Sequence, residues 1–191
     1  MELKVGISNR HVHLAQDDFN ILFGSDIELV KHKELSQPGE FASTFKISIK
    51  TDKSIIDGVR IIGPIRKYTQ VEISKTDAYK LGINPPVRDS GNLEGSEPIT
   101  LIGPKGTITL NEGCIIASRH IHITNNDMIK YNLVAGSKVK VRVDGVKGGI
   151  LDNVNLKIDD NYSLELHLDA DDANAHLLNQ GDIVTVIRED K

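Results

Sequence analysis

The stretch SNRHVHLAQDDF, residues 8–19, recurs in altered form as SRHIHITNNDM at residues 118–128. A second repeat aligns without a gap, because IIDGVRIIGPIRKYTQVEISKTDA at residues 55–78 matches ILDNVNLKIDDNYSLELHLDADDA at residues 150–173. Internal repeats indicate that one structural unit occurs more than once in a chain. The sequence therefore predicts two related halves, each containing an H-x-H motif.

Most apolar segments of the chain are short and alternate with polar residues. Period-two alternation interrupted by Gly, Pro and Asp is typical of β-strands. The expected strands cover residues 5–8, 45–51, 59–63, 69–74, 99–103, 106–110, 114–118, 138–143, 154–158, 164–168 and 183–187. The chain is therefore expected to be mainly β.

Helical patterns are few and brief. Asp, Asn or Thr can cap a turn or two of helix at four places. These are residues 15–23, 76–81, 124–131 and 170–179. Residues 83–98 are rich in Pro, Gly, Ser and Asp, which favours a long, turn-dense loop, and loops of this length are often functional.

The composition excludes several classes of protein. The 191 residues are 39% hydrophobic and 26% charged, and the formal charge of −4 gives no basic field for nucleic acid. No stretch approaches the roughly 20 apolar residues of a membrane span, and the amino terminus does not resemble a signal peptide. The single cysteine, Cys114, cannot form an intramolecular disulfide. We expect a cytoplasmic protein that acts on a small molecule.

The two H-x-H motifs indicate metal binding. Residues i and i+2 of a strand point to the same face, so His11 with His13, and His120 with His122, each present two imidazoles side by side. The ungapped repeat aligns Glu72 with His167, which gives each half a third residue of ligand type. Imidazole and carboxylate are common ligands of zinc. A single H-x-H motif often only lines a solvated strand face, but two copies with a matched third residue favour a metal site.

Polar residues near these motifs suggest how an anion could bind. Arg66 lies six residues before Glu72, so the two side chains share a face if the strand is continuous. Its planar guanidinium matches phosphate oxygens, although an ordinary surface ion pair is an equal alternative. Ser90 lies in the long loop, where a turn could bring it over a substrate. Arg10 and Arg119 precede the histidine pairs and point away from them, either supporting the ligands or bracing the other half.

Six segments together resemble one family, the PduL-type phosphate propanoyltransferases of propanediol utilisation. The resemblance extends from about Val5 to Val186. The segments are GISNRHVHL, GPIRKYTQVEIS, PPVRDSGNLEGS, ITLIGPKG, ASRHIHIT and LELHLDADDANAHLLNQGD.

The resemblance implies a fold and a site. It implies two small β-barrels related by a pseudo-two-fold, with short α-helices and the active site between them. The first strand would pack with the second barrel, so residues 1–9 with 118–191 would form one domain and residues 10–117 the other. It implies two zinc ions per chain, a phosphate-binding arginine at Arg66 and an active-site serine at Ser90. The implied metal ligands are His11, His13, Glu72, His120, His122 and His167.

The resemblance also implies the reaction. Acyl-CoA and inorganic phosphate would give acyl phosphate and free coenzyme A, with a propanoyl or acetyl group, and the enzyme would be a homodimer. Microcompartment members of the family carry an amino-terminal extension, whereas four residues precede Val5 here, so encapsulation is not expected.

Three alternatives stay open at this point. An acyl-enzyme could form on Cys114 or Ser90, although direct attack of phosphate on the thioester is favoured. The same metals could activate water, making the protein a hydrolase. A duplicated β module could also be braced by zinc without any catalysis.

Overall fold

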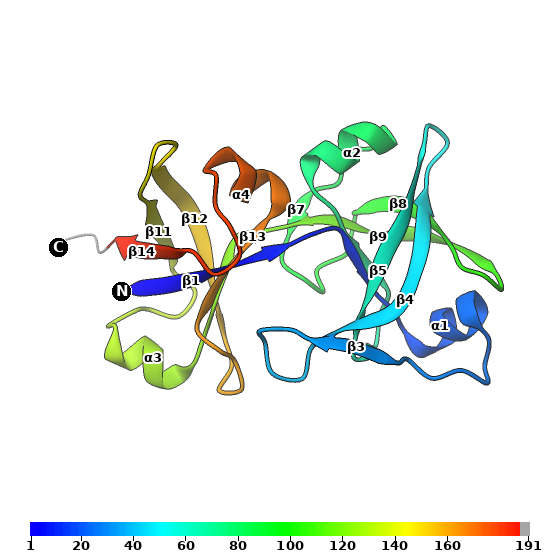
Figure 1. The fold of residues 1–191 in the computed structure, drawn as a ribbon, viewed down its shortest axis with the longest axis horizontal. Helices are drawn as coiled ribbons and strands as arrows, with labels where there is room; N and C mark the ends of the chain where they lie inside the picture. The colour runs from blue at the N-terminus through cyan, green and yellow to red at the C-terminus, as the bar shows by residue number, and fades with distance from the viewer. Residues whose placement is uncertain (188–191) are drawn as a thin grey trace. The chain divides into compact units, whose positions relative to one another are not determined.

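A computed structural model describes residues 1–187 of the chain (Figure 1). The chain divides into two compact units. Within the described residues, unit 1 comprises residues 1–8, 36–38 and 118–187, and unit 2 comprises residues 9–35 and 39–117. None of the helices within residues 1–187 is long and apolar enough to cross a membrane.

Unit 1 is a closed barrel of six strands. In spatial order the strands are β1 (Glu2–Ser8), β13 (Glu165–Asp169), β10 (His120–Ile123), β12 (Gly149–Ile158), β11 (Lys138–Val143) and β14 (Ile183–Ile187). The barrel closes because the first and last strands of the chain pair with each other, the blue β1 beside the red β14 in Figure 1. Two short helices, α3 (Asn125–Lys130) and α4 (Ala170–Ala175), complete this unit.

Unit 2 contains a second closed circuit of six strands. It runs through β4 (Phe41–Lys50), β5 (Ile55–Gly63), β2 (His11–His13), β6 (Gln70–Glu72), β9 (Thr107–Ala117) and β8 (Glu97–Ile102). The circuit closes because β8 pairs with both β9 and β4. The remaining elements of this unit are β3 (Lys31–Glu34), β7 (Val87–Arg88), α1 (Gln16–Phe23) and α2 (Lys75–Leu81).

The two units share one topology, which confirms the mainly β fold of two small barrels with short helices. In each unit the H-x-H strand pairs in parallel with one strand and antiparallel with another: β2 with β5 and β6, and β10 with β12 and β13. His11 lies opposite Arg60 and Glu72, and His120 lies opposite Asn155 and His167. The structural equivalences therefore follow the ungapped sequence repeat.

The first strand of each repeat belongs to the other unit. β1 precedes β2 in the chain but closes the barrel of unit 1, and β9 precedes β10 but closes the circuit of unit 2. Each unit consequently depends on residues distant in sequence. Both cores are built from the inward-facing residues of these strands, such as Val5, Ile121 and Leu166 in unit 1 and Val12, Ile61 and Val71 in unit 2.

Several element boundaries differ from the sequence-based expectations. The segments 106–110 and 114–118 form one long strand, β9, because Gly113 continues the extended chain instead of ending it. The polar strand β3 was not expected, since its four residues are all exposed and show no alternation. The loop at 83–98 contains the short strand β7. Helix α4 ends at Ala175, before 179, and Leu177 then takes a left-handed conformation with φ of 55°.

The start of α2 allows a prediction about stability. Ser74 and Asp77 form a capping box, in which the Ser74 hydroxyl accepts from the Asp77 amide and the Asp77 carboxylate accepts from the Ser74 amide. Replacing an N-cap serine by alanine typically costs about 1 kcal/mol. We expect Ser74→Ala to lower the free energy of unfolding by this amount in urea titrations. Lys80→Ala in the exposed last turn of the same helix is the control and should change it by less than about 0.5 kcal/mol.

Candidate metal centres and phosphate site

Unit 2 gathers the first group of potential metal ligands. His11 and His13 lie on β2, and Glu72 lies on β6 directly opposite His11. One ligand atom from each of the three residues falls within 4.8 Å of the others. His11 Nε2 and Glu72 Oε2 are 3.6 Å apart, which is long for a hydrogen bond. It is close to the roughly 3.3 Å between two ligands bound about 2.0–2.1 Å from a tetrahedral zinc.

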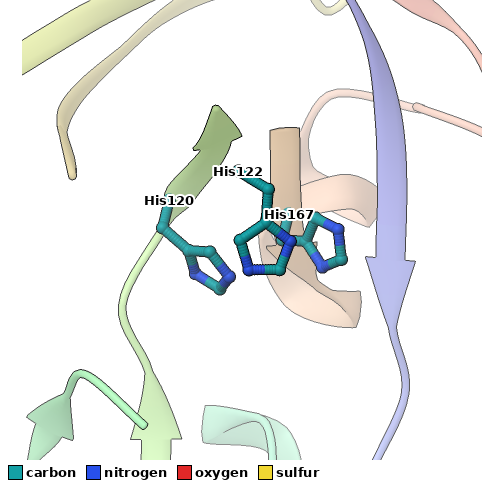
Figure 2. A group of neighbouring side chains, drawn as sticks. All are labelled: His120, His122 and His167. Carbon is teal, nitrogen blue, oxygen red and sulfur yellow. The ribbon is translucent and has the colours of Figure 1, made fainter. Parts of the chain in front are cut away.

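Unit 1 gathers the second group. His120 and His122 project from β10, and His167 projects from β13, where it pairs with His120 (Figure 2). The ring centroid of His122 lies 4.8 Å from that of His120 and 4.4 Å from that of His167. Here too one ligand atom of each residue lies within 4.8 Å of the others. The structure thus brings all six expected ligands into two triads, one in each unit.

Backbone carbonyl groups orient three of the imidazoles in the same way, and one of these contacts joins Ile62 O to His13 Nδ1 at 3.2 Å. Asn9 O lies 2.8 Å from His11 Nδ1, and Ser118 O lies 2.8 Å from His120 Nδ1. A carbonyl oxygen only accepts, so in each neutral ring Nδ1 carries the hydrogen and Nε2 keeps its lone pair. Metal-binding histidines usually have such a hydrogen bond on their other nitrogen.

Burial holds His120 and His122 in the neutral form. Burial, followed by the charges of Lys157 and His167, lowers the pKa of His120 well below its ordinary value. Burial, followed by the charges of His167 and Lys157, lowers the pKa of His122 to about 3. Both rings are therefore neutral at pH 7, and neutral imidazole is the form that coordinates metal.

The donor set of unit 1 fits a bound cation. Within residues 1–187, His122 Nδ1 is a buried polar side-chain atom without a hydrogen-bond partner. Leaving such an atom unsatisfied costs about 1–3 kcal/mol. A metal ion among the three rings would account for the mutual approach of the imidazoles. The residues present therefore suit a divalent metal such as zinc.

Arg66 reaches the first triad through side chains and not along a continuous strand, which the sequence-based expectation required. β5 ends at Gly63 and β6 begins at Gln70, so Arg66 lies in the connection between them. There its backbone amide bonds to Leu14 O. Its Nη1 donates to Ser90 Oγ at 3.2 Å, and its Nη2 pairs with Glu40 Oε1 at 2.9 Å. The long loop thus brings Ser90 to Arg66.

Gln70, which the sequence patterns did not single out, connects this pair to Glu72 of the first triad. Its Oε1 accepts from the Gly91 amide at 2.7 Å, which fixes the orientation of the side-chain amide. Its Nε2 then donates to Ser90 Oγ at 2.8 Å and to Glu72 Oε1 at 2.5 Å. A signal was present, because Gln70 lies two positions before Glu72 on β6 and therefore on the same face of the strand. A continuous polar chain therefore runs from Arg66 through Ser90 and Gln70 to Glu72.

Arg10 and Arg119 each brace their own unit. Arg10 pairs with Asp77 at 2.7 Å, and Arg119 pairs with Asp172 at 2.7 Å, in both cases through two nitrogens. Asp77 and Asp172 occupy equivalent positions of the repeat at the starts of α2 and α4. These bidentate pairs tie each H-x-H strand to the helix that follows the third ligand.

Cys114 is a buried core residue on β9, as its apolar flanks predict. Its exposed fraction is 0%, and burial, with a smaller contribution from Glu97, raises the pKa of the thiol to about 12. A thiol must be deprotonated to act as a nucleophile. The protonated thiol at pH 7 opposes an acyl-enzyme at this residue.

The raised pKa of the Cys114 thiol predicts how this residue reacts with alkylating agents. At pH 8 the folded protein should resist alkylation by iodoacetamide, because its thiol is buried and protonated. The unfolded chain, with a cysteine pKa near about 8.5, should react readily. Mass spectrometry of samples treated with iodoacetamide, with and without urea, measures the alkylation of the unfolded and the folded protein. We also expect Cys114→Ala to retain wild-type kcat, and loss of activity in a folded variant would restore the cysteine mechanism.

Two barrels of one topology, each with a candidate metal triad, and an arginine-serine pair joined to one triad define the class of this site. Comparison with known proteins specifies it further. A family model described as phosphate propanoyltransferase matches residues 4–179. The chain belongs to the phosphate propanoyltransferase family, which is a family of acyltransferase enzymes.

Relatives of similar length support this membership. A phosphate propanoyltransferase of Thermotoga maritima is 48% identical over 184 residues, covering 96% of this chain and 88% of that protein. One of Lachnoclostridium phytofermentans is 46% identical over 96% of this chain and 86% of its own length. One of Rhodobacter capsulatus is 42% identical over 95% and 85% respectively.

Proposed function

We propose that the protein is a zinc-dependent phosphate acyltransferase that interconverts acyl-CoA and phosphate with acyl phosphate and coenzyme A. The acyl group is propanoyl or acetyl. The observation that carries the proposal is the polar chain from Arg66 to Glu72, because it couples an anion-binding group to a metal ligand in a member of this family.

Two zinc ions per chain are proposed, one in each triad. His11, His13 and Glu72 would hold one ion, and His120, His122 and His167 the other. When bound, zinc supplies Lewis-acid stabilisation of negative charge on oxygen. Backbone carbonyls fix three of the imidazoles, those of His11, His13 and His120, so the ligands need little reorganisation.

Arg66 would bind the phosphate. A guanidinium has five N–H donors, and the two that contact Ser90 and Glu40 leave three for an anion. The ion pair with Glu40 holds the planar group in place, so its remaining donors are preorganised for phosphate oxygens. Local charge of this kind is needed because the whole chain carries a net charge of −4.

Ser90 would donate a hydrogen bond to the substrate and would not be acylated. A serine hydroxyl accepts two hydrogen bonds and donates one. Arg66 and Gln70 both donate to Ser90 Oγ, so the hydroxyl proton is directed elsewhere. Neither partner can take that proton as a base, which disfavours Ser90 as a nucleophile.

The reaction then proceeds by direct transfer. A phosphate oxygen forms a bond to the thioester carbonyl carbon, the carbon–sulfur bond breaks, and coenzyme A leaves as thiolate. Arg66 and Ser90 would orient the phosphate, which lowers the entropic part of the barrier.

The family resemblance further supports a homodimer. Light scattering of the purified protein would measure its oligomeric state.

Product analysis tests the reaction type. Trapping with hydroxylamine should detect acyl phosphate when propanoyl-CoA or acetyl-CoA is mixed with phosphate and enzyme. Its formation should require phosphate, and the two initial rates rank the acyl groups. Free carboxylate released at the same rate without phosphate would instead establish a hydrolase.

A further inference from the structure

Glu165 is a buried carboxylate that the proposed reaction does not use. It lies on β13 two residues before His167, and only 5% of its surface is exposed. In the ungapped repeat it is equivalent to Gln70, which lies two residues before Glu72 on β6. Each third ligand thus has a buried polar neighbour at the same position.

The neighbour contacts the ligand in both units. Gln70 Nε2 donates to Glu72 Oε1 in unit 2, and Glu165 Oε2 lies 2.8 Å from His167 Nε2 in unit 1. The chemical types are exchanged: unit 2 combines a carboxylate ligand with an amide neighbour, and unit 1 combines an imidazole ligand with a carboxylate neighbour. Each triad is therefore associated with one glutamate: Glu72 is a member of the triad in unit 2, and Glu165 contacts the triad in unit 1.

The surroundings of Glu165 hold its carboxylate in place. The Ser36 hydroxyl and Gln37 Nε2 both donate to Oε2, the latter at 3.2 Å. On the neighbouring strand, a Cβ added to Gly6 would lie 2.9 Å from Glu165 Cδ. The absent side chain at Gly6 thus leaves the space that the carboxylate occupies.

We propose that Glu165 is a positioning residue for the metal site of unit 1, which orients His167 and supplies the negative charge that this triad lacks. The inference rests on the proposed metal triads. A carboxylate can only accept from a neutral imidazole, so His167 Nε2 carries the hydrogen and Nδ1 is the nitrogen that would coordinate a metal. A carboxylate on the outer nitrogen of a metal-bound histidine raises the basicity of the ligand and fixes its ring.

Cobalt binding to full-length variants tests the proposal. Because Co(II) bound to a protein site absorbs visible light, titration against a competing chelator reports affinity. The double variant His11→Ala/His13→Ala removes the triad of unit 2 and serves as background. Adding Glu165→Gln, which keeps an oxygen acceptor for Ser36 but removes the charge, should weaken cobalt binding about 10- to 100-fold. Adding Glu2→Gln, a carboxylate on the exposed side of β1, should leave it unchanged.

The outcomes separate this proposal from a purely structural role. Unchanged cobalt affinity and spectrum in Glu165→Gln would overturn it. Gly6→Ala retains Glu165 but crowds its carboxylate, so it should also weaken cobalt binding. This variant provides the test if Glu165→Gln does not fold. Thermal melting of the metal-free variants should be close to that of the background. Absence of cobalt binding in the background would overturn the proposed metal site of unit 1 itself, whereas binding without a Glu165 effect would overturn only the present inference.

Discussion

Replacing His120 by alanine is expected to lower kcat/KM for phosphate-dependent release of coenzyme A by about 10³-fold or more. Loss of a Lewis acid removes several kcal/mol of transition-state stabilisation, and each 1.4 kcal/mol or so corresponds to about tenfold in rate. His120 lies between Asn155 and His167 in the barrel and contributes a fixed Nε2 to the triad. The measurement is the initial rate of coenzyme A release together with zinc per chain.

A matched histidine variant controls for the loss of any imidazole. His176 lies in the same unit, and its Nδ1 hydrogen-bonds to Lys147 O, apart from either triad. His176→Ala should retain both activity and zinc content. A folded His120→Ala protein with wild-type activity would contradict the role of the second triad.

Replacing Arg66 by alanine is expected to lower kcat/KM with respect to phosphate by about 10²- to 10³-fold, the range typical of a lost charge-stabilising donor. The substitution removes three free donors for phosphate and also leaves Glu40 without its ion-pair partner. Arg66→Lys should recover part of the loss, because an ammonium keeps the charge but not the planar fork. Steady-state kinetics with phosphate as the varied substrate measures both variants.

An exposed arginine provides the comparison. Arg142 of β11 pairs with Asp144 at 3.1 Å and has 54% of its side chain exposed. Arg142→Ala should leave the kinetics unchanged. A folded Arg66→Ala protein with wild-type kcat and wild-type KM for phosphate would refute phosphate binding at Arg66.

The repeated part of the sequence predicted the fold best. Strand alternation and the ungapped match identify β5 with β12 and β6 with β13, because one pairing pattern is used twice. Irregular segments were less predictable. Arg66 lies in a connection where its backbone amide donates to Leu14 O, so its position depends on a tertiary contact and not on strand period.

The supporting residues show the same contrast. Gln70 and Glu165 occupy equivalent strand positions, so the repeat contained the information needed to find them. Gln37, by comparison, comes from residues 36–38, which belong to unit 1 although the flanking segments belong to unit 2. No periodic pattern specifies such a contact, because it forms between segments more than a hundred residues apart.

The most direct test of metal-dependent acyl transfer to phosphate is the rate of coenzyme A release from propanoyl-CoA by purified protein, with and without phosphate, before chelation, after it, and after zinc is restored. We expect release only when phosphate and zinc are both present, with two zinc ions per active chain. Release that persists unchanged in folded, fully metal-free protein would contradict it.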